Sequence, residues 1–185
     1  TFRNLTSGSN NVAIGPTASN SLTSGTGNVS IGISAGRLNL SGYYTVAIGQ
    51  GALESNLSND NVAVGTNALN ANTTGINNTA HGFGALRYST TGYRNVALGW
   101  TAGYAVTTGS DNIMIGGGNE GKATDTGVIR TGTSTYQKKT FIAGTRNVQT
   151  GLSTAKTVFI DANGQLGTIK SSRQFQENIQ PMGSA

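Results

Sequence analysis

The motif NVAIG at residues 11–15 recurs with little change along the first two thirds of the chain. Its later copies are NVSIG at 28–32, TVAIG at 45–49, NVAVG at 61–65, NTAHG at 78–82, NVALG at 95–99 and NIMIG at 112–116. Successive copies are 17, 17, 16, 17, 17 and 17 residues apart, so one repeat is a residue shorter than the others. A short fixed period of this kind is typical of stacked-coil proteins and argues against an ordinary globular enzyme.

Each repeat contains the parts of one coil. Val and Ile two residues apart, with a small residue between them, indicate a short strand with one buried face. A Gly-x-x-Ala segment follows, and a turn motif ending in Gly, such as NTTG at 72–75, closes the repeat. A weaker second strand is expected at Ala52–Leu53, Ala68–Leu69 and Ala85–Leu86. The sequence therefore predicts an all-β solenoid of about seven 17-residue coils over residues 1–119.

The apolar content of each coil is small. Four or five small side chains per coil bury little surface, and the open strand edges of a single rod remain available for pairing. Identical chains that pack one coil face against their symmetry mates would remove both problems. We therefore expect a homotrimer.

The iterated NVAIG motif, with GxxA and a TTG turn, resembles the head repeats of YadA-type trimeric autotransporter adhesins. The resemblance covers residues 5–118. It implies a left-handed parallel β-roll that winds into a trimer.

Composition limits the other function classes. The chain has no cysteine, so it offers no thiol nucleophile and no cysteine metal site. Only 10% of its residues are charged. It has no run of 18 apolar residues, and its start at Thr1 without a leader indicates a processed or excised piece. The net charge is +1 over residues 1–119 and +4 over 120–185. The basic part could attract anionic glycans, lipid headgroups or nucleic acid, or be an ordinary solvated surface. We expect no nucleic-acid partner.

The repeat stops after residue 118, and a β-rich trimeric collar is expected over residues 120–170. Strand-like runs occupy 127–130, 139–144 and 157–160. The pair Asn163–Gly164 is a strong signal for a tight hairpin, with residues 165–169 as the returning strand.

Residues 171–185 have a helical pattern, which Ser171 and Gln174 would begin as a capping box. The stretch 164–183 resembles the junction before the intramolecular chaperone domain of endosialidase-type phage tail spikes. In that family Ser-Asp-x-x-x-Lys cleaves itself, and here Ser171 takes the position of the nucleophile, Ser172 that of Asp and Gln176 that of Lys. Gln174 also replaces the usual Arg. Because an amide cannot serve as the base that a Ser nucleophile needs, we expect no cleavage, and a plain helix cap is the alternative role of Ser171.

Candidate binding residues are aromatic. Exposed aromatic rings on a rigid surface suit sugar rings or a protein partner, and packing between coils or chains is the alternative. The candidates are Tyr43, Tyr88, Tyr93, Trp100 and Tyr104. His81, the single histidine, replaces the usual Ile of the motif and is a candidate for the trimer axis or a simple half-exposed side chain. No metal site and no cofactor are expected.

These observations favour a trimeric fibre segment, outside the cell on a cell surface or virion, that presents many copies of a site to a host, a prey cell or a glycan. Two alternatives remain. The Ile-Gly-x-x-Ala segment resembles the hexapeptide of left-handed β-helix acyltransferases, which need three such hexads per coil where this chain has one. The pairs Thr73–Thr74, Thr90–Thr91 and Thr107–Thr108 raise the possibility of an ice-binding solenoid, although they precede turn glycines and are expected at corners.

Overall fold

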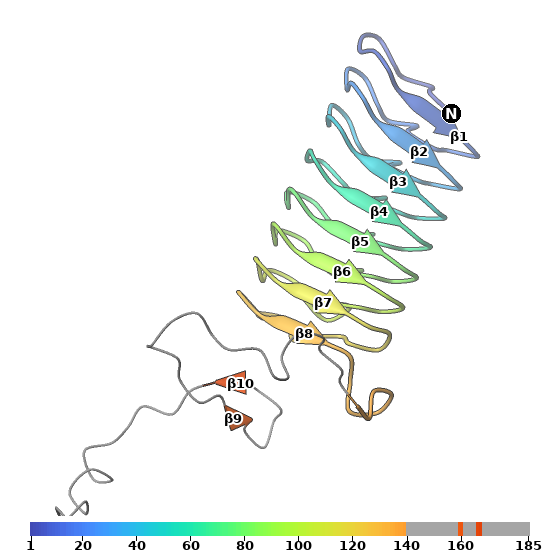
Figure 1. The fold of residues 1–185 in the computed structure, drawn as a ribbon. Helices are drawn as coiled ribbons and strands as arrows, with labels where there is room; N and C mark the ends of the chain where they lie inside the picture. Colours follow the sequence, from blue (N-terminus) through green and yellow to red (C-terminus); the bar gives the residue numbers. More distant parts are fainter. Residues whose placement is uncertain (140–158, 161–165, 168–185) are drawn as a thin grey trace, which may run out of the picture. The chain divides into compact units, whose positions relative to one another are not determined.

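The structure is a computed structural model that describes residues 1–139 in full and the strands at residues 159–160 and 166–167 by their backbone. The chain divides into two compact units, Thr1–Lys139 and Thr140–Ala185. The first unit is an all-β solenoid, as the repeat predicts, and Figure 1 shows its strands stacked one after another.

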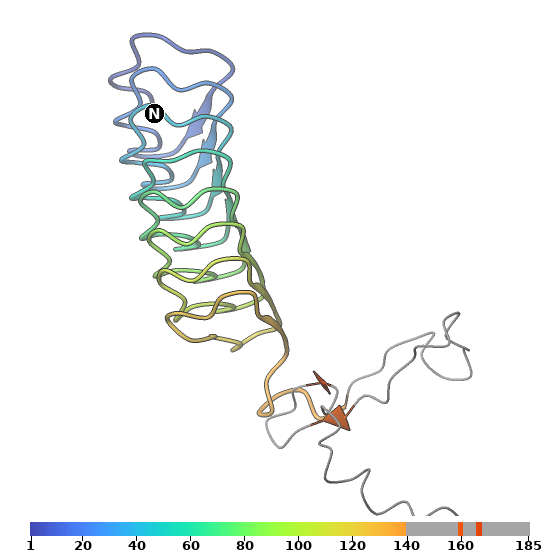
Figure 2. The same cartoon turned by 90° about the vertical axis from the view of Figure 1, so that its left-hand side faces the viewer.

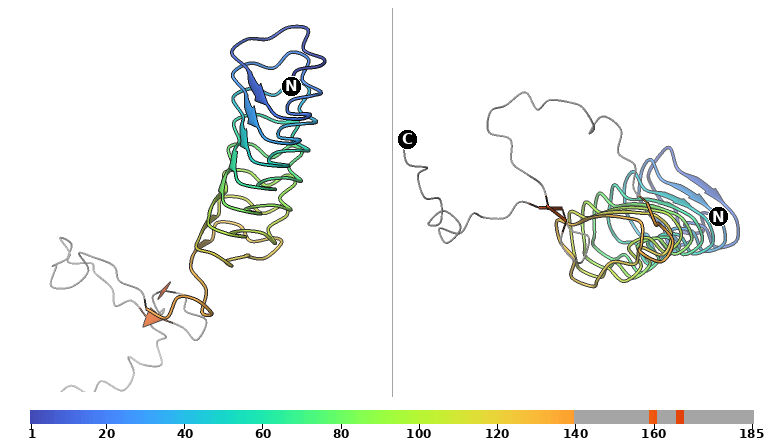
Figure 3. Two further views of the ribbon diagram at one scale, coloured as in Figure 1. Left: turned by 90° about the vertical axis from the view of Figure 1, so that its right-hand side faces the viewer. Right: turned by 60° about the horizontal axis from the view of Figure 1, so that its bottom comes forward.

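One parallel sheet of eight three-residue strands runs along the solenoid in chain order. The strands are β1 (Val12–Ile14), β2 (Val29–Ile31), β3 (Val46–Ile48), β4 (Val62–Val64), β5 (Thr79–His81), β6 (Val96–Leu98), β7 (Ile113–Ile115) and β8 (Ile129–Thr131). Equivalent motif positions pair in register, so Val12 lies opposite Val29 and Ile14 opposite Ile31. The repeat is therefore one turn of the chain, and Figures 2 and 3 show the turns from the side and along the stack.

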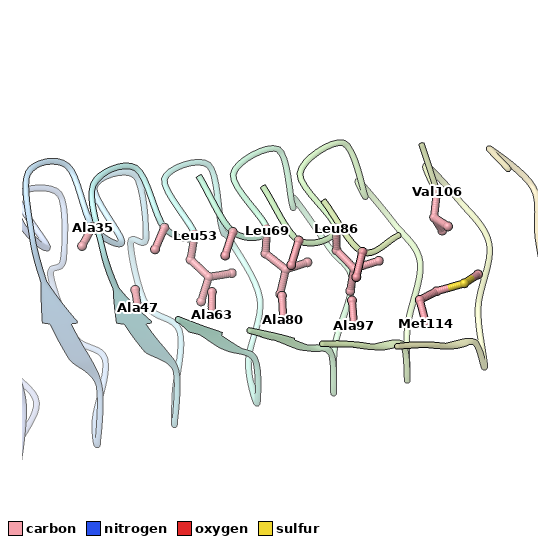
Figure 4. Packing of buried hydrophobic residues seen from close by; sticks show 14 residues of the cluster. Ala35, Ala47, Leu53, Ala63, Leu69, Ala80, Leu86, Ala97, Val106 and Met114 are labelled. Atoms are coloured by element: carbon pink, nitrogen blue, oxygen red, sulfur yellow. The ribbon is translucent and has the colours of Figure 1, made fainter. Parts of the chain in front are cut away.

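The interior of the solenoid is lined by the central residue of each strand, which is Ala or Ser in β1–β6 and Met114 in β7. Ala47, Ala63, Ala80 and Ala97 are almost completely buried, while the residues that flank them in each strand are exposed or half-buried. Figure 4 shows these alanines pointing across the core toward buried leucines of the opposite wall. The larger Val and Ile side chains of the motif therefore point away from the core of their own chain.

The opposite wall corrects the prediction of a second strand. Within residues 1–139 the Ala-Leu segments form runs of turns, and Leu53, Leu69 and Leu86 have φ values of 48°, 48° and 49°. Extended strands require negative φ, so these leucines cannot belong to one. Their N–H groups still donate to carbonyls of the next coil. This wall is thus hydrogen-bonded between coils without being a sheet.

A ladder of buried asparagines supports the residue just before each strand. The Oδ1 atom of Asn78 accepts from the backbone N–H of Asn95 at 3.0 Å, and Oδ1 of Asn95 accepts from the N–H of Asn112 at 3.1 Å. The Nδ2 group of Asn95 also donates to the carbonyl of Gly109 at 2.9 Å. These hydrogen bonds satisfy buried amide groups in successive coils, which explains why Asn recurs at this position in every copy of the motif except at Thr45.

The short repeat is accommodated by a change at its turn. Ser58 takes the place that Gly occupies in the other coils, and its Oγ donates to the carbonyl of Gly75 at 2.6 Å. Around it, Asn61 and Asn72 donate to the same carbonyl at 2.8 and 3.0 Å. These hydrogen bonds tie the shortened turn to the carbonyl of Gly75 in the following coil.

The corner after each strand requires glycine. Gly82 has φ of 138°, and a Cβ atom there would lie 2.3 Å from the carbonyl oxygen of Gly99 in the next coil. Both the backbone conformation and the close approach exclude other residues. The last residue of the NVAIG motif is thus explained by the tight stacking of coils.

The last strand of the solenoid, β8, lies within the range predicted as the collar. Its central residue Arg130 is in register with Met114 and forms an ion pair with Asp125, with Nε 3.0 Å from Oδ2. A charged pair thus follows the apolar interior at this point.

In the second unit, β9 (Phe159–Ile160) and β10 (Leu166–Gly167) pair antiparallel, as predicted for the runs at 157–160 and 165–169, with Ile160 opposite Leu166. The run predicted at 139–144, except Lys139, and the helix predicted at 171–185 lie outside the described residues. Among the residues that the structure describes, no helix is long and apolar enough to cross a membrane.

Candidate binding surfaces

The outward positions of β1–β7 form a continuous surface that we call the outward sheet face. With one interruption it is apolar along the solenoid. Its apolar members are Val12, Ile14, Val29, Ile31, Val46, Ile48, Val62, Val64, Val96, Leu98, Ile113 and Ile115. Ile14 is 57% exposed, Leu98 48% and Val62 36%. Monomeric proteins rarely expose an apolar patch of more than a few hundred Å2, so a surface of this length indicates an interaction site.

The interruption lies in β5, where both outward residues are polar. Thr79 pairs in register with Val62 and Val96, and His81 pairs with Val64 and Leu98. Both side chains are exposed in the single chain. The structure thus places His81 on the outward sheet face, surrounded by apolar neighbours.

Tyr88 and Tyr104 are brought together on the opposite wall. Their rings pack edge to face with centroids 4.8 Å apart, and their hydroxyl groups are 3.3 Å apart. This hydrogen bond, with some desolvation, raises the pKa of Tyr104 above its ordinary value. The guanidinium of Arg87 lies over the ring of Tyr88, 5.6 Å from its centroid. We call these three residues the tyrosine–arginine patch.

Arg87 differs from the other arginines of the coils around it. Arg37 pairs with Glu54, and Arg94 pairs with Asp111, while Arg87 has no carboxylate partner within residues 1–139. A cation beside two tyrosine rings offers stacking and charge to one ligand.

Tyr43 and Tyr93 occupy the same position of two different coils. Two coils separate them, so they are roughly 14 Å apart along the stack at the usual strand spacing. Each is paired locally: the ring of Tyr43 lies 6.5 Å from that of Tyr44, and Arg94 lies 4.5 Å above the ring of Tyr93. They form two separate contacts and do not combine into one site.

Trp100 belongs to a third group of exposed aromatic residues, of which the sequence analysis selected only Trp100. Trp100 and Phe83 follow the corner glycines of successive coils, and both are about half exposed. Tyr136 lies beside Trp100 over Gly118, where an added Cβ would be 2.9 Å from the Tyr136 ring and 3.8 Å from the indole. Tyr136 lies outside the repeat, and no periodic signal placed it there. Of the five predicted aromatic residues, Tyr88 and Tyr104 are thus in contact, while Tyr43, Tyr93 and Trp100 lie in separate places along the solenoid.

The threonine pairs differ within each pair. The hydroxyl groups of Thr73, Thr90 and Thr107 donate to carbonyls of the following coil at 3.0, 3.2 and 3.1 Å. The second member of each pair is exposed at the corner. The surface thus presents a single column of free threonine side chains instead of a flat array two residues wide.

No group of three or more His, Asp or Glu side chains that could hold a metal ion occurs among the described residues. The predicted vestigial cleavage junction of Ser171, Ser172 and Gln176 lies outside them.

Comparisons of the chain with protein-family models, with curated proteins and with solved structures give no match.

Proposed function

We propose that this chain is a segment of a homotrimeric fibre, displayed outside the cell on a cell surface or virion, that presents many copies of a binding surface for adhesion or recognition. In this proposal the chain has no catalytic activity and binds no cofactor. The observation that carries the proposal is the outward sheet face, which is apolar in six of its seven strands.

The area of this face fits an interface between copies of the chain. Twelve Val, Ile and Leu side chains, each exposed or half-buried, present on the order of 800 Å2, which is what one partner buries in a standard protein interface. The charged residues that would keep such a surface in water are missing from it: β1–β7 contain none at their outward positions. Burial against identical chains would supply the apolar contact that the thin alanine core cannot.

Three copies suit the shape of the face. Its two outward residues per strand form a stripe roughly 7 Å wide that follows the whole stack. A narrow straight stripe can meet two others along a common axis, so that each copy contacts both neighbours. This agrees with the trimer that the YadA-type resemblance implies.

A rigid trimer makes weak surface contacts effective. Three identical sites held on one rod gain apparent affinity through their effective concentration. The tyrosine–arginine patch is the best candidate for such a site, and its residues fit a glycan with an acidic group. It lies on the wall opposite the sheet and would stay accessible in the trimer.

Light scattering of the purified protein tests the assembly directly, with three chain masses as the expected result. Substituting Val62→Asp and Val96→Asp, which are exposed in the single chain, should abolish the trimer. Ala71→Asp with Ala105→Asp places the same charges in the same two coils on the other wall and should leave the trimer intact. A monomeric wild type, or equal behaviour of the two variants, would contradict the proposal.

A glycan array tests the recognition role, with the trimer as probe. We expect the trimer to bind acidic glycans. Tyr88→Ala and Arg87→Ala should each weaken this binding, whereas Tyr43→Ala should leave it unchanged. If the trimer binds no glycan and no cell surface, the segment serves as a spacer.

The C-terminal residues 171–185 are proposed as the start of a chaperone-like region that guides trimer assembly without cleaving itself. Mass spectrometry of the expressed protein checks this, and a product ending at Ser171 would refute it.

A further inference from the structure

The outward sheet face is nearly the same in every coil, and this creates an alignment problem. Each apolar strand presents Val or Ile at its first position and Ile, Val or Leu at its third. If one chain slid along another by one coil, about 4.8 Å, apolar side chains would again meet apolar side chains. The hydrophobic effect has no direction, so only the contact at the end coil would be lost. The apolar face therefore drives association but hardly fixes the axial position of one chain relative to the next.

β5 is the one strand of β1–β7 that breaks this sameness. Its outward residues are Thr79 and His81, and the strands on either side present only Val and Leu. No charged side chain occupies an outward position in β1–β7, so a displaced Thr79 or His81 would find no ionic partner on that face. The fold thus contains one polar layer at a defined height in an otherwise apolar stripe.

We propose that Thr79 and His81 form an alignment layer that fixes the axial register of the three chains. This inference rests on the trimer of the proposed function. When the chains are aligned, the three pairs lie at one height, where imidazole nitrogens and threonine hydroxyls donate to and accept from each other or from shared water. When they are displaced by one coil, each pair faces the Val and Leu side chains of β4 or β6 and loses those hydrogen-bond partners, and burying an unpaired polar group costs free energy. A single polar position in a coiled-coil seam sets register in the same way, at some expense of stability.

The layer also makes assembly specific for chains that carry it in the same coil. Exchanging the outward residues of β2 and β5 gives a chain of identical composition, Val29→Thr, Ile31→His, Thr79→Val and His81→Ile, whose layer lies three coils away. In a mixed trimer, aligning the layers would displace the two kinds of chain by three coils and lose the apolar contacts of three end coils. Each kind should therefore assemble with itself.

Co-refolding and native mass spectrometry test this specificity. Tagged wild-type chain is refolded with an equal amount of the exchanged chain, and the populations of pure and mixed trimers are measured. We expect mixed trimers to be depleted by roughly tenfold relative to binomial mixing. Tagged and untagged wild type form the control pair and should mix binomially. Binomial mixing of wild type with the exchanged chain would overturn the inference.

Disulfide trapping provides a second measurement that does not need the exchanged chain. Val29 and Val62 are two coils apart, so their Cα atoms are roughly 10 Å apart in height, beyond the reach of a disulfide between aligned chains. A Val29→Cys chain mixed with a Val62→Cys chain should form few mixed disulfides. Adding Thr79→Val and His81→Ile to both chains should raise the yield of mixed disulfides severalfold, and an unchanged yield would overturn the inference.

Light scattering distinguishes failure of this inference from failure of the proposed function. A monomeric wild-type protein would contradict both proposals. A trimer whose chains mix and cross-link regardless of Thr79 and His81 would contradict only the alignment layer.

Discussion

Alternate residues of each strand face the interior and the exterior of the solenoid, and the two sets differ in size more than in polarity. On β6 the inward residue is Ala97, which is completely buried, and the outward residues are Val96 and Leu98, 38% and 48% exposed. Ordinary half-buried strands place their larger apolar residues inside. Here a leucine of the other wall fills the space opposite the inward alanine, and the larger Met114 of β7 fits where Gly103 takes the leucine position. The larger Val, Ile and Leu residues of the motif therefore face outward and remain available to another chain.

This contrast separates two kinds of stabilisation. Inside one chain, close packing, glycine corners and bonded asparagines hold the coils together. On the outside, the outward sheet face leaves apolar side chains exposed, and in our proposal they are buried against the same face of two further copies. Substitutions on the two sides should therefore differ in how much they change the free energy of unfolding. Each change is measured by thermal or urea unfolding, monitored by circular dichroism at one fixed protein concentration because association shifts apparent stability.

The largest effect is expected at the corner glycine. Gly82→Ala would place a Cβ 2.3 Å from the carbonyl oxygen of Gly99 at φ of 138° and should cost at least ~3 kcal/mol. Gly117→Ala is the matched control, since its nearest contact would be 3.9 Å away and its φ is not positive. It should change stability by less than about 0.5 kcal/mol. Equal costs at the two glycines would show that coil stacking is looser than the structure indicates.

The next effect compares neighbouring residues on opposite faces of β6. Ala97→Leu adds volume to a closed interior and should destabilise the fold by about 2–3 kcal/mol. Val96→Leu adds less volume on the outward sheet face and should cost less than about 1 kcal/mol. If Ala97→Leu were tolerated, the alanine face would not be the core.

The third test addresses the polar interior. Asn95→Ala removes the acceptor for the buried N–H of Asn112 and the donor to the carbonyl of Gly109, and should cost about 2 kcal/mol. Asn20→Ala changes a half-exposed side chain that makes no hydrogen bond within residues 1–139 and should be nearly neutral. A neutral Asn95→Ala would mean that water replaces the ladder.

The smallest effect concerns the ion pairs. Asp111→Asn breaks the pair that raises the pKa of Arg94 through a hydrogen bond, yet both side chains are well exposed, so no measurable change in the unfolding midpoint is expected. Asp125→Asn breaks the pair with Arg130, in which the Asp125 side chain is only 10% exposed, and should cost up to about 1 kcal/mol. A larger loss at Asp111 than at Asp125 would contradict this order.

The candidate sites illustrate where periodic reasoning stops. The turn glycines before Tyr43 and Tyr93 are enough to place these two residues at equivalent positions of two coils, and the structure has them there. Tyr88 and Tyr104 are 16 residues apart, so the 17-residue period places them in different columns, yet their rings are in contact. Long side chains in adjacent coils can touch even when their positions differ by one residue. Whether Tyr88 and Tyr104 touch depends on the direction of their side chains, which the period does not specify. Tyr136, which lies near Trp100 at Gly118, belongs to the chain beyond the repeat, so the period of the repeat could not indicate its position.

The sequence by itself determined the seven repeated coils, their length, the parallel pairing and its register, because an in-register stack converts a repeat along the chain directly into neighbours in space. It did not indicate that β8 continues the same sheet beyond the repeat. The tertiary structure alone decided which strand face is inside, since that depends on the space between two walls whose separation no single strand encodes. It also replaced the expected second strand by turns with positive φ, because the backbone there must reverse direction while it still bonds to the next coil.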